Sequence, residues 1–226
     1  MHNRRADAWA VRPHDLLWVD AAPVVHGDQA LPSWADAAWQ QVAPVVVRRA
    51  ARSAGGVPVG LRGSERHQRC AAHVAESAIV RVVTPEQLAA CCAGMDPLPW
   101  AVRRPDLPAL VVLGMVAPAL NAAGLQWGPT GGVGFALASG LPVLRAQSDL
   151  DLVVHLDQPP SAETRRVLTA VAAQAICRVD LQIDTGFGGF ALREWLATPQ
   201  QVLLKTDRGP RLVTDPWAAG TAEIVQ

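Results

Sequence analysis

The sequence predicts an α+β protein with two lobes, the second being a mixed sheet flanked by helices. Three observations lead to this prediction. In two acidic segments, Ser148–Val154 and Cys177–Asp184, polar and apolar residues alternate as expected of strands. An apolar helix is expected from Leu107 to Ala123, ahead of both. A proline-rich stretch from Asp96 to Pro108 is typical of a connector between lobes.

The first lobe, residues 1–100, is expected to be an α/β lobe with a binding role. The strand-like runs are Asp15–Val19, Pro44–Val47, Val57–Leu61 and Ile79–Val83. Between them, Ser64–Glu76 has helical character. A second helix is expected to start at Thr84-Pro85-Glu86-Gln87, because Thr84 suits the cap, Pro85 the first position and Gln87 can reach back.

The second lobe, residues 101–226, is expected to hold the reacting groups. A glycine-rich turn, Trp127–Gly134, follows the apolar helix and leads into a short helix at Val133–Ala138 and the two acidic strands. In the last part of the chain, Val202–Thr206 and Arg211–Val213 predict a hairpin around the turn at residues 207–210.

Composition limits the possible partners and location. The 226 residues include 20 basic and 20 acidic side chains, so no global charge favours nucleic acid or a membrane surface. The longest apolar runs fall short of a membrane span. The first residues lack the apolar core of a signal peptide, and the four cysteines form no Cys-x-x-Cys pair. We therefore expect a cytoplasmic protein with reduced thiols.

Asp149 and Asp151 are the strongest candidates for a reactive site. Side chains alternate along a strand, so the two carboxylates point the same way while Leu150 and Leu152 point into a core. Because neighbouring anions repel, the pair makes sense if Mg²⁺ lies between them and takes oxygen ligands from both. The alternative is an ordinary Asp-x-Asp on the solvated face of an edge strand.

A third carboxylate is expected from the next acidic strand. Val179, Leu181 and Ile183 alternate there with Asp180, Gln182 and Asp184. If this strand pairs beside the first, Asp180 can complete a three-carboxylate metal site or act as general base. Asp184 is close to the following turn, so Asp180 is favoured.

The glycine-rich turn is expected to bind phosphate. Glycines such as Gly131 and Gly132 allow backbone N–H groups to approach an anion closely. A glycine loop followed by Asp-x-Asp on a strand is the layout of metal-dependent nucleotidyl transfer.

Arginines between residues 48 and 69 are candidates for polyphosphate binding. Arg62, Arg66 and Arg69 follow spacings of four and three, and would share one face of a helix. Arg48 and Arg49 end a strand, and guanidinium groups bind phosphate with a fixed fork. The alternative is a solvated surface stripe with local salt bridges.

Several ordered motifs resemble the phosphoribosyl-dephospho-CoA transferases, the holo-acyl-carrier-protein synthases of malonate decarboxylase. The resemblance spans nearly the whole chain and rests on Arg12–Trp18, Pro58–Gly63, Trp127–Phe135, Ser148–Leu152 and Leu203–Thr206. It implies a nucleotidyltransferase related in its core to DNA polymerase β. The related superfamily commonly has Gly-Ser in the phosphate loop where this chain has Gly131-Gly132, so a hydroxyl contact from position 132 is not available.

The resemblance also implies the reaction. The substrate would be 2′-(5″-triphosphoribosyl)-3′-dephospho-CoA and the acceptor a serine of the apo acyl-carrier-protein subunit of malonate decarboxylase, with diphosphate leaving. Asp149, Asp151 and Asp180 would be the catalytic residues and would hold one or two Mg²⁺ ions. The expected substrate-binding residues are Gly131, Gly132, Ser148, Lys205, Arg48, Arg49, Arg62 and Arg66.

Three alternatives share many of these features. The equivalent transferase for the citrate lyase carrier protein would use the same chemistry on another acceptor. A nucleotidyltransferase that adenylylates a protein or small molecule would share the acidic core. A non-catalytic chaperone or scaffold for a carrier protein is the third, although the three intact carboxylates argue against it.

Overall fold

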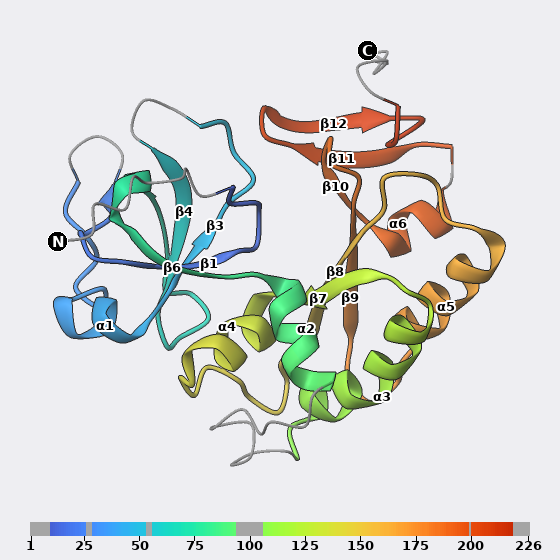
Figure 1. Ribbon diagram of the computed structural model, residues 1–226, viewed down its shortest axis with the longest axis horizontal. Helices are drawn as coiled ribbons and strands as arrows, with labels where there is room; N and C mark the ends of the chain where they lie inside the picture. Colours follow the sequence, from blue (N-terminus) through green and yellow to red (C-terminus); the bar gives the residue numbers. More distant parts are fainter. Residues whose placement is uncertain (1–9, 26–28, 53–55, 94–105, 199, 219–226) are drawn as a thin grey trace, which may run out of the picture. The chain divides into compact units, whose positions relative to one another are not determined.

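The computed structural model describes residues 10–25, 29–52, 56–93, 106–198 and 200–218. The chain divides after Thr84 into two compact units (Figure 1). The expected boundary at residue 100 therefore lies too far along the chain. The helix that follows Thr84 belongs to the second unit, because its first residue, Pro85, lies against Gly128 of that unit's sheet. The expected connector at 96–108 lies mostly outside the described residues.

The first unit is built on a six-stranded sheet with the order β2-β5-β4-β3-β1-β6, and every paired strand in it is antiparallel. Its elements are β1 (Leu16–Val19), β2 (Val24–Val25), α1 (Ala37–Val42), β3 (Val45–Val47), β4 (Val57–Arg62), β5 (Arg69–Val74), the short 3₁₀ turn η2 (Glu76–Ala78) and β6 (Ile79–Val83). The four strands expected in this lobe are confirmed. Helix α1 begins after Asp36, whose carboxylate accepts the backbone N–H of Trp39.

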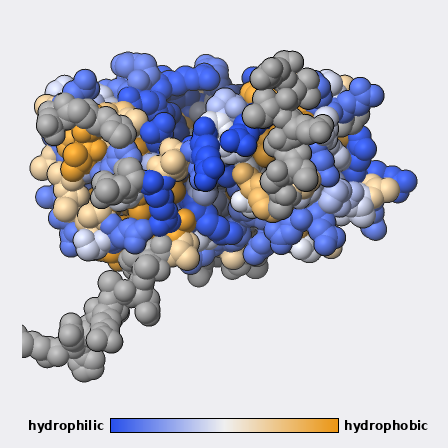
Figure 2. Space-filling model, turned by 90° about the horizontal axis from the view of Figure 1, so that it is seen from above, coloured by the Kyte–Doolittle hydropathy of each residue, from blue (hydrophilic) through white to orange (hydrophobic). Residues whose placement is uncertain are grey.

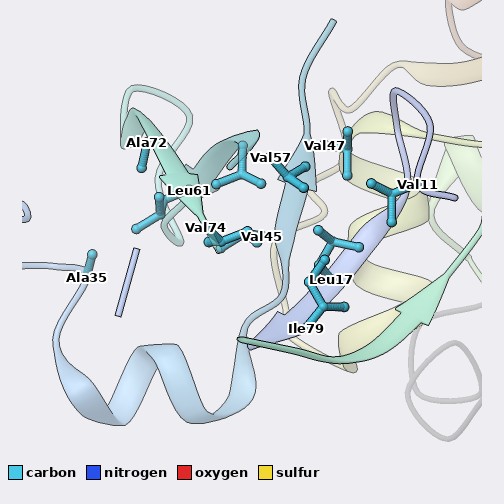
Figure 3. Close-up of a cluster of buried hydrophobic side chains, with 11 residues drawn as sticks. Val11, Leu17, Ala35, Val45, Val47, Val57, Leu61, Ala72, Val74 and Ile79 are labelled. Atoms are coloured by element: carbon cyan, nitrogen blue, oxygen red, sulfur yellow. The ribbon is translucent and has the colours of Figure 1, made fainter. Parts of the chain in front are cut away.

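The expected helix at Ser64–Glu76 is wrong, because Arg69–Val74 is strand β5. Ala72 and Val74 join the buried core of the first unit, and each pairs with a residue of β4. Figure 3 shows this core, where Val57 and Leu61 of β4 lie among apolar side chains from β1, β3, β5 and β6. Pairing with β4 and burial of Ala72 and Val74 outweigh the arginine spacing that resembles a helical face.

The second unit is a mixed six-stranded sheet with the order β12-β11-β10-β9-β8-β7 and with helices packed on it. Its elements are α2 (Pro85–Ala93), α3 (Pro108–Ala122), β7 (Gln126–Pro129), α4 (Gly131–Ser139), β8 (Leu150–His155), α5 (Ala162–Ala172), β9 (Val179–Asp184), β10 (Gly189–Ala191), α6 (Leu192–Ala197), β11 (Val202–Thr206) and β12 (Gly209–Val213). Only β8 and β9 run parallel, joined by α5; the other neighbours are antiparallel. The protein is therefore α+β, as the sequence predicts.

Three sequence expectations in the second unit are confirmed, and one changes. The apolar helix is α3, the short helix expected at Val133–Ala138 is part of α4, and the hairpin is β11–β12. Gly209, with a φ of 111°, starts β12 directly after the turn. The glycine-rich stretch, expected as a turn, is instead strand β7 followed by helix α4, which begins at Gly131. Glycines 131 and 132 thus form the first turn of a helix and not a free loop.

Hydrophilic residues dominate the face of the described surface that Figure 2 shows. Within the ranges described above, no helix is both long enough and apolar enough to cross a membrane.

Candidate active site

Asp151 and Asp180 lie directly opposite each other on the parallel strands β8 and β9. Register partners in a sheet project on the same face, so both carboxylates leave that face side by side. Both residues are half-buried, while their neighbours Leu150, Leu152 and Leu181 are buried on the other face. We call the face of β8 and β9 that carries Asp151 and Asp180 the carboxylate face; the opposite face is apolar and buried.

Asp149 lies one residue before β8, close to Cys177 at the entry to β9. Burial raises the pKa of the Cys177 thiol; a hydrogen bond with the Leu150 backbone opposes this shift, and the charge of Asp149 adds to it. The side chain of Asp149 is therefore near enough to the thiol to affect its ionisation.

The carboxylate of Asp180 points to Arg178, which lies just before β9. Nε of Arg178 lies 2.9 Å from Oδ1 of Asp180, and the two side chains are 59% and 39% exposed. An exposed ion pair of this kind contributes about 0–1 kcal/mol, so a dication or a substrate can displace it. In the described ranges no group of three or more His, Cys, Asp or Glu residues is arranged to hold a metal ion. The three-carboxylate cluster expected from the sequence is therefore not formed among the described residues. Asp151 and Asp180 are partners across β8 and β9, and Asp149 lies just before β8.

The carboxylate oxygens of Asp151 and Asp180 are of the type that Mg²⁺ binds. Mg²⁺ in phosphoryl-transfer sites takes one or two protein carboxylates, completes its shell with phosphate oxygens and water, and rarely uses an all-protein cage. Asp151 and Asp180 supply hard oxygen donors on adjacent strands. A pair of carboxylates on an accessible sheet face meets this requirement.

The start of helix α4 lies against the carboxylate of Asp151. The N–H of Thr130 donates to the backbone oxygen of Asp151 over 2.9 Å. Gly131 has a φ of 54°, and a Cβ built there would lie 1.8 Å from Oδ2 of Asp151. Only glycine fits both the backbone conformation and the space. Gly132 follows in the first turn of α4, where helix N–H groups are unpaired and favour anions.

Strand register also places Lys205 on the carboxylate face. Asp184 pairs with Gly189, and Gly189 pairs with Lys205, so these residues and Asp180 project on one side of the sheet. Lys205 is exposed, and Gly189 has no side chain between it and Asp184. Ser148 lies before β8, where its hydroxyl accepts the N–H of Arg145.

Asp184 has a structural environment that separates it from Asp180. It is 6% exposed, and its Oδ1 accepts the N–H of Gly186 over 2.9 Å within the turn after β9. This contact gives Asp184 a structural role in the turn, and Asp180 stays the predicted reactive carboxylate.

Sequence reasoning missed a contact between a histidine and a carboxylate near these residues. His155 is the register partner of Asp184, and its Nε2 lies 3.0 Å from Oε1 of Glu86 in α2. His155 follows Asp151 by four residues on β8, so the alternation of side chains could have placed both on the same face. The contact ties helix α2 to strand β8.

A separate cavity of about 400 Å³ lies beside the β11–β12 hairpin. It is lined by Phe187, Leu204 and Arg211. Leu204 and Arg211 are cross-strand partners, and their side chains project on the opposite face of the sheet from Lys205. None of the predicted catalytic carboxylates lines it.

The predicted arginines lie in the first unit, on or near the β4–β5 hairpin. Arg62 ends β4 and is the register partner of Arg69, Arg66 lies in the connecting turn, and Arg48 and Arg49 follow β3. The helical face expected for Arg62, Arg66 and Arg69 does not exist. A sheet brings two of them together instead.

Comparisons with known proteins cover both units. Residues 12–85 match the family described as the phosphoribosyl-dephospho-CoA transferase MdcG N-terminal domain, and residues 88–216 match the corresponding C-terminal domain. No solved structure matches the chain.

Similar curated proteins carry one name. A phosphoribosyl-dephospho-CoA transferase of Pseudomonas putida strain GB-1 is 48% identical over 93% of this chain and 97% of its own length. Proteins of the same name from Pseudomonas syringae pv. tomato and Klebsiella pneumoniae subsp. pneumoniae are 43% and 42% identical, over 93% and 91% of this chain and 95% and 96% of their own lengths. With both domains matched in order, this chain belongs to the phosphoribosyl-dephospho-CoA transferase MdcG family.

Proposed function

We propose that this chain transfers the 2′-(5″-phosphoribosyl)-3′-dephospho-CoA group from its triphosphate precursor to a serine of the apo acyl-carrier-protein subunit of malonate decarboxylase. Diphosphate is the second product. The observation that carries the proposal is the Asp151–Asp180 pair beside the start of α4, in a chain of this family. The names of the relatives support the donor substrate. A cytoplasmic location is part of the proposal.

The proposed catalytic unit is a nucleotidyltransferase related in its core to DNA polymerase β. Its support is the order of elements: strand β7, helix α4 starting on two glycines, then Asp149-Leu150-Asp151 leading into β8. The parallel β8–α5–β9 crossover brings the third carboxylate, Asp180, next to Asp151. In this arrangement a phosphate group at the start of α4 would lie beside the carboxylate of Asp151.

Asp149, Asp151 and Asp180 would hold Mg²⁺ by their carboxylate oxygens. When bound, Mg²⁺ neutralises the phosphate oxygens and the negative charge that develops on the leaving diphosphate. Asp180 must turn away from Arg178 to join such a site, and the exposed ion pair between them opposes this only weakly.

The protein's own groups then position the reaction. The serine hydroxyl oxygen attacks the α-phosphorus, the bond between the α-phosphorus and the bridging oxygen breaks, and diphosphate leaves. Asp180 accepts the proton of the serine hydroxyl. The first N–H groups of α4 at Gly131 and Gly132, together with Lys205, stabilise the diphosphate charge. Ser148 is proposed to bind the substrate beside Asp149.

The first unit is proposed to bind a reactant, either the substrate or the carrier protein. Its candidate residues are Arg48, Arg49, Arg62 and Arg66, whose guanidinium groups suit phosphate oxygens. This keeps catalysis in the second unit and recognition in the first.

The test is diphosphate release measured with four pairs of substrates. The triphosphoribosyl precursor should release diphosphate with the apo carrier of malonate decarboxylase and Mg²⁺. The citrate lyase carrier tests the alternative acceptor, and ATP with either carrier tests an adenylylating enzyme. A rate with ATP that exceeds the rate with the precursor would replace the proposal, and binding of a carrier without release would favour a scaffold.

A further inference from the structure

An exposed sheet face in the first unit gathers arginines around two small residues. Gly60 of β4 is the register partner of Ala71 of β5, and two residues further along, Arg62 is the partner of Arg69. Because side chains alternate, all four project on the face opposite the buried core of Val59, Leu61 and Ala72.

Arg48 reaches the same face from the other side of β4. Its N–H donates to the backbone oxygen of Pro58, which places it beside β4. Its Cγ and Cδ each lie 3.6 Å from the position that a Cβ on Gly60 would take, so the stem of Arg48 crosses Gly60 toward Arg62. We name the surface formed by Arg48, Gly60, Arg62, Arg69 and Ala71 the arginine bay.

The floor of the arginine bay is open, and two of its three arginines are exposed. Ala71, Arg48 and Arg69 are exposed, whereas Arg62 is half-buried. Among the residues that the structure describes, neither Arg48 nor Arg69 forms an ion pair with an acidic side chain. Partial burial and the nearby charge of Arg66 lower the pKa of Arg69. Like charges directly opposite each other on adjacent strands destabilise a sheet.

The adjoining turn is fixed in a way that holds this charge in place. Oε1 of Gln68 accepts the N–H of Glu65 over 3.0 Å and fills the space beside Gly63. Arg66 lies inside this turn, and Arg69 follows it directly. Because this turn holds arginines close together, their charges repel in the free protein, and a bound anion would relieve that repulsion.

We propose that the arginine bay binds a diphosphate group. Guanidinium forks on one sheet face match the oxygens of adjacent phosphates, and a floor of glycine and alanine leaves room for them. The identity of the ligand rests on the proposed function: dephospho-CoA carries a diphosphate bridge, and free diphosphate is the other product. Both share this chemistry. The bay is a binding site within the first unit, independent of the carboxylates of the second unit, and it adds Arg69 to the predicted residues.

The test is equilibrium binding of 3′-dephospho-CoA and of inorganic diphosphate to the full chain by titration calorimetry. It is done without Mg²⁺ and in an Asp151→Asn background, so that the second unit contributes little. Arg48→Gln, Arg62→Gln and Arg69→Gln should each weaken binding about 10- to 100-fold, as for hydrogen bonds to a charged partner. Arg52→Gln is the matched control, because Arg52 is in the same unit but is engaged by Glu76.

The outcomes are separable. A loss with dephospho-CoA assigns the bay to the substrate, and a loss with diphosphate alone assigns it to the product; either supports a diphosphate site. The proposal is overturned if all three variants keep the wild-type affinity for both ligands, or if Arg52→Gln loses as much affinity as they do. The melting temperature of Arg69→Gln should hold or rise, since its like-charge pair with Arg62 is removed, which excludes unfolding as the cause in that variant. Because no transfer is measured, failure of the proposed reaction leaves this result standing.

Discussion

Gly131→Ala tests whether the position of the Asp151 carboxylate matters for transfer. The added Cβ would lie 1.8 Å from Oδ2 and 2.6 Å from Cγ of Asp151, whereas ordinary contacts start at 3.4 Å. The carboxylate must therefore shift by roughly 1.6 Å, and a misplacement of about 1 Å at a reacting group can cost about 100-fold in rate. We expect kcat for diphosphate release to fall by about 100-fold or more.

The same substitution also has a stability cost that must be separated from the effect on rate. Residue 131 has a φ of 54°, where a residue with a Cβ costs about 1–2 kcal/mol. Gly124→Ala is the matched control, because Gly124 has a φ of 65° and nothing within 4 Å of its added Cβ. Both variants should lose about 1–2 kcal/mol from backbone strain, or about 2–8 °C in melting temperature.

Only Gly131→Ala should lose transfer. The assay is steady-state diphosphate release at saturating precursor and carrier, alongside thermal unfolding of both variants. If Gly131→Ala turned over at the rate of Gly124→Ala, the contact between α4 and Asp151 would have no role in the reaction, and the proposed site would be wrong.

Two further predictions use the neighbouring carboxylates. Asp180→Asn should reduce diphosphate release far more than Asp184→Asn, because Asp184 is buried in a turn; the reverse order would show that the third carboxylate is misassigned. Asp149→Asn should lower the pKa of Cys177, since the Asp149 charge helps to raise it. Iodoacetamide labelling of Cys177 at pH 8, followed by peptide mass spectrometry, should then be faster than in the wild type, and an equal or slower rate would place Asp149 away from the thiol.

The carboxylate face could be predicted from the sequence because it depends on local alternation. Asp180, Gln182 and Asp184 alternate with Val179, Leu181 and Ile183, and such a pattern fixes which side chains share a face. The pairing of Asp151 with Asp180 could not be predicted, because it depends on the register that the α5 crossover sets between β8 and β9. Nor does any local pattern show that Asp180 turns toward Arg178.

The glycine and arginine segments show why spacing alone was insufficient. Gly131 and Gly132 allow a loop, yet strand β7 and the buried Val133 of α4 make them the first turn of a helix. The spacings of Arg62, Arg66 and Arg69 fit a helical face, but pairing with β4 and burial of Ala72 favour a strand. In both segments, tertiary packing decided a conformation that local residues left open.

The most direct test of the central claim is the intact mass of the apo carrier protein after incubation with the precursor and Mg²⁺. With the wild-type chain, the carrier should gain the mass of one phosphoribosyl-dephospho-CoA group, located on a serine by fragmentation. Asp151→Asn should give no gain while melting at the wild-type temperature or slightly above it, since one of two neighbouring anions is removed. An unmodified carrier with the wild-type chain, or full modification by Asp151→Asn, would contradict the account.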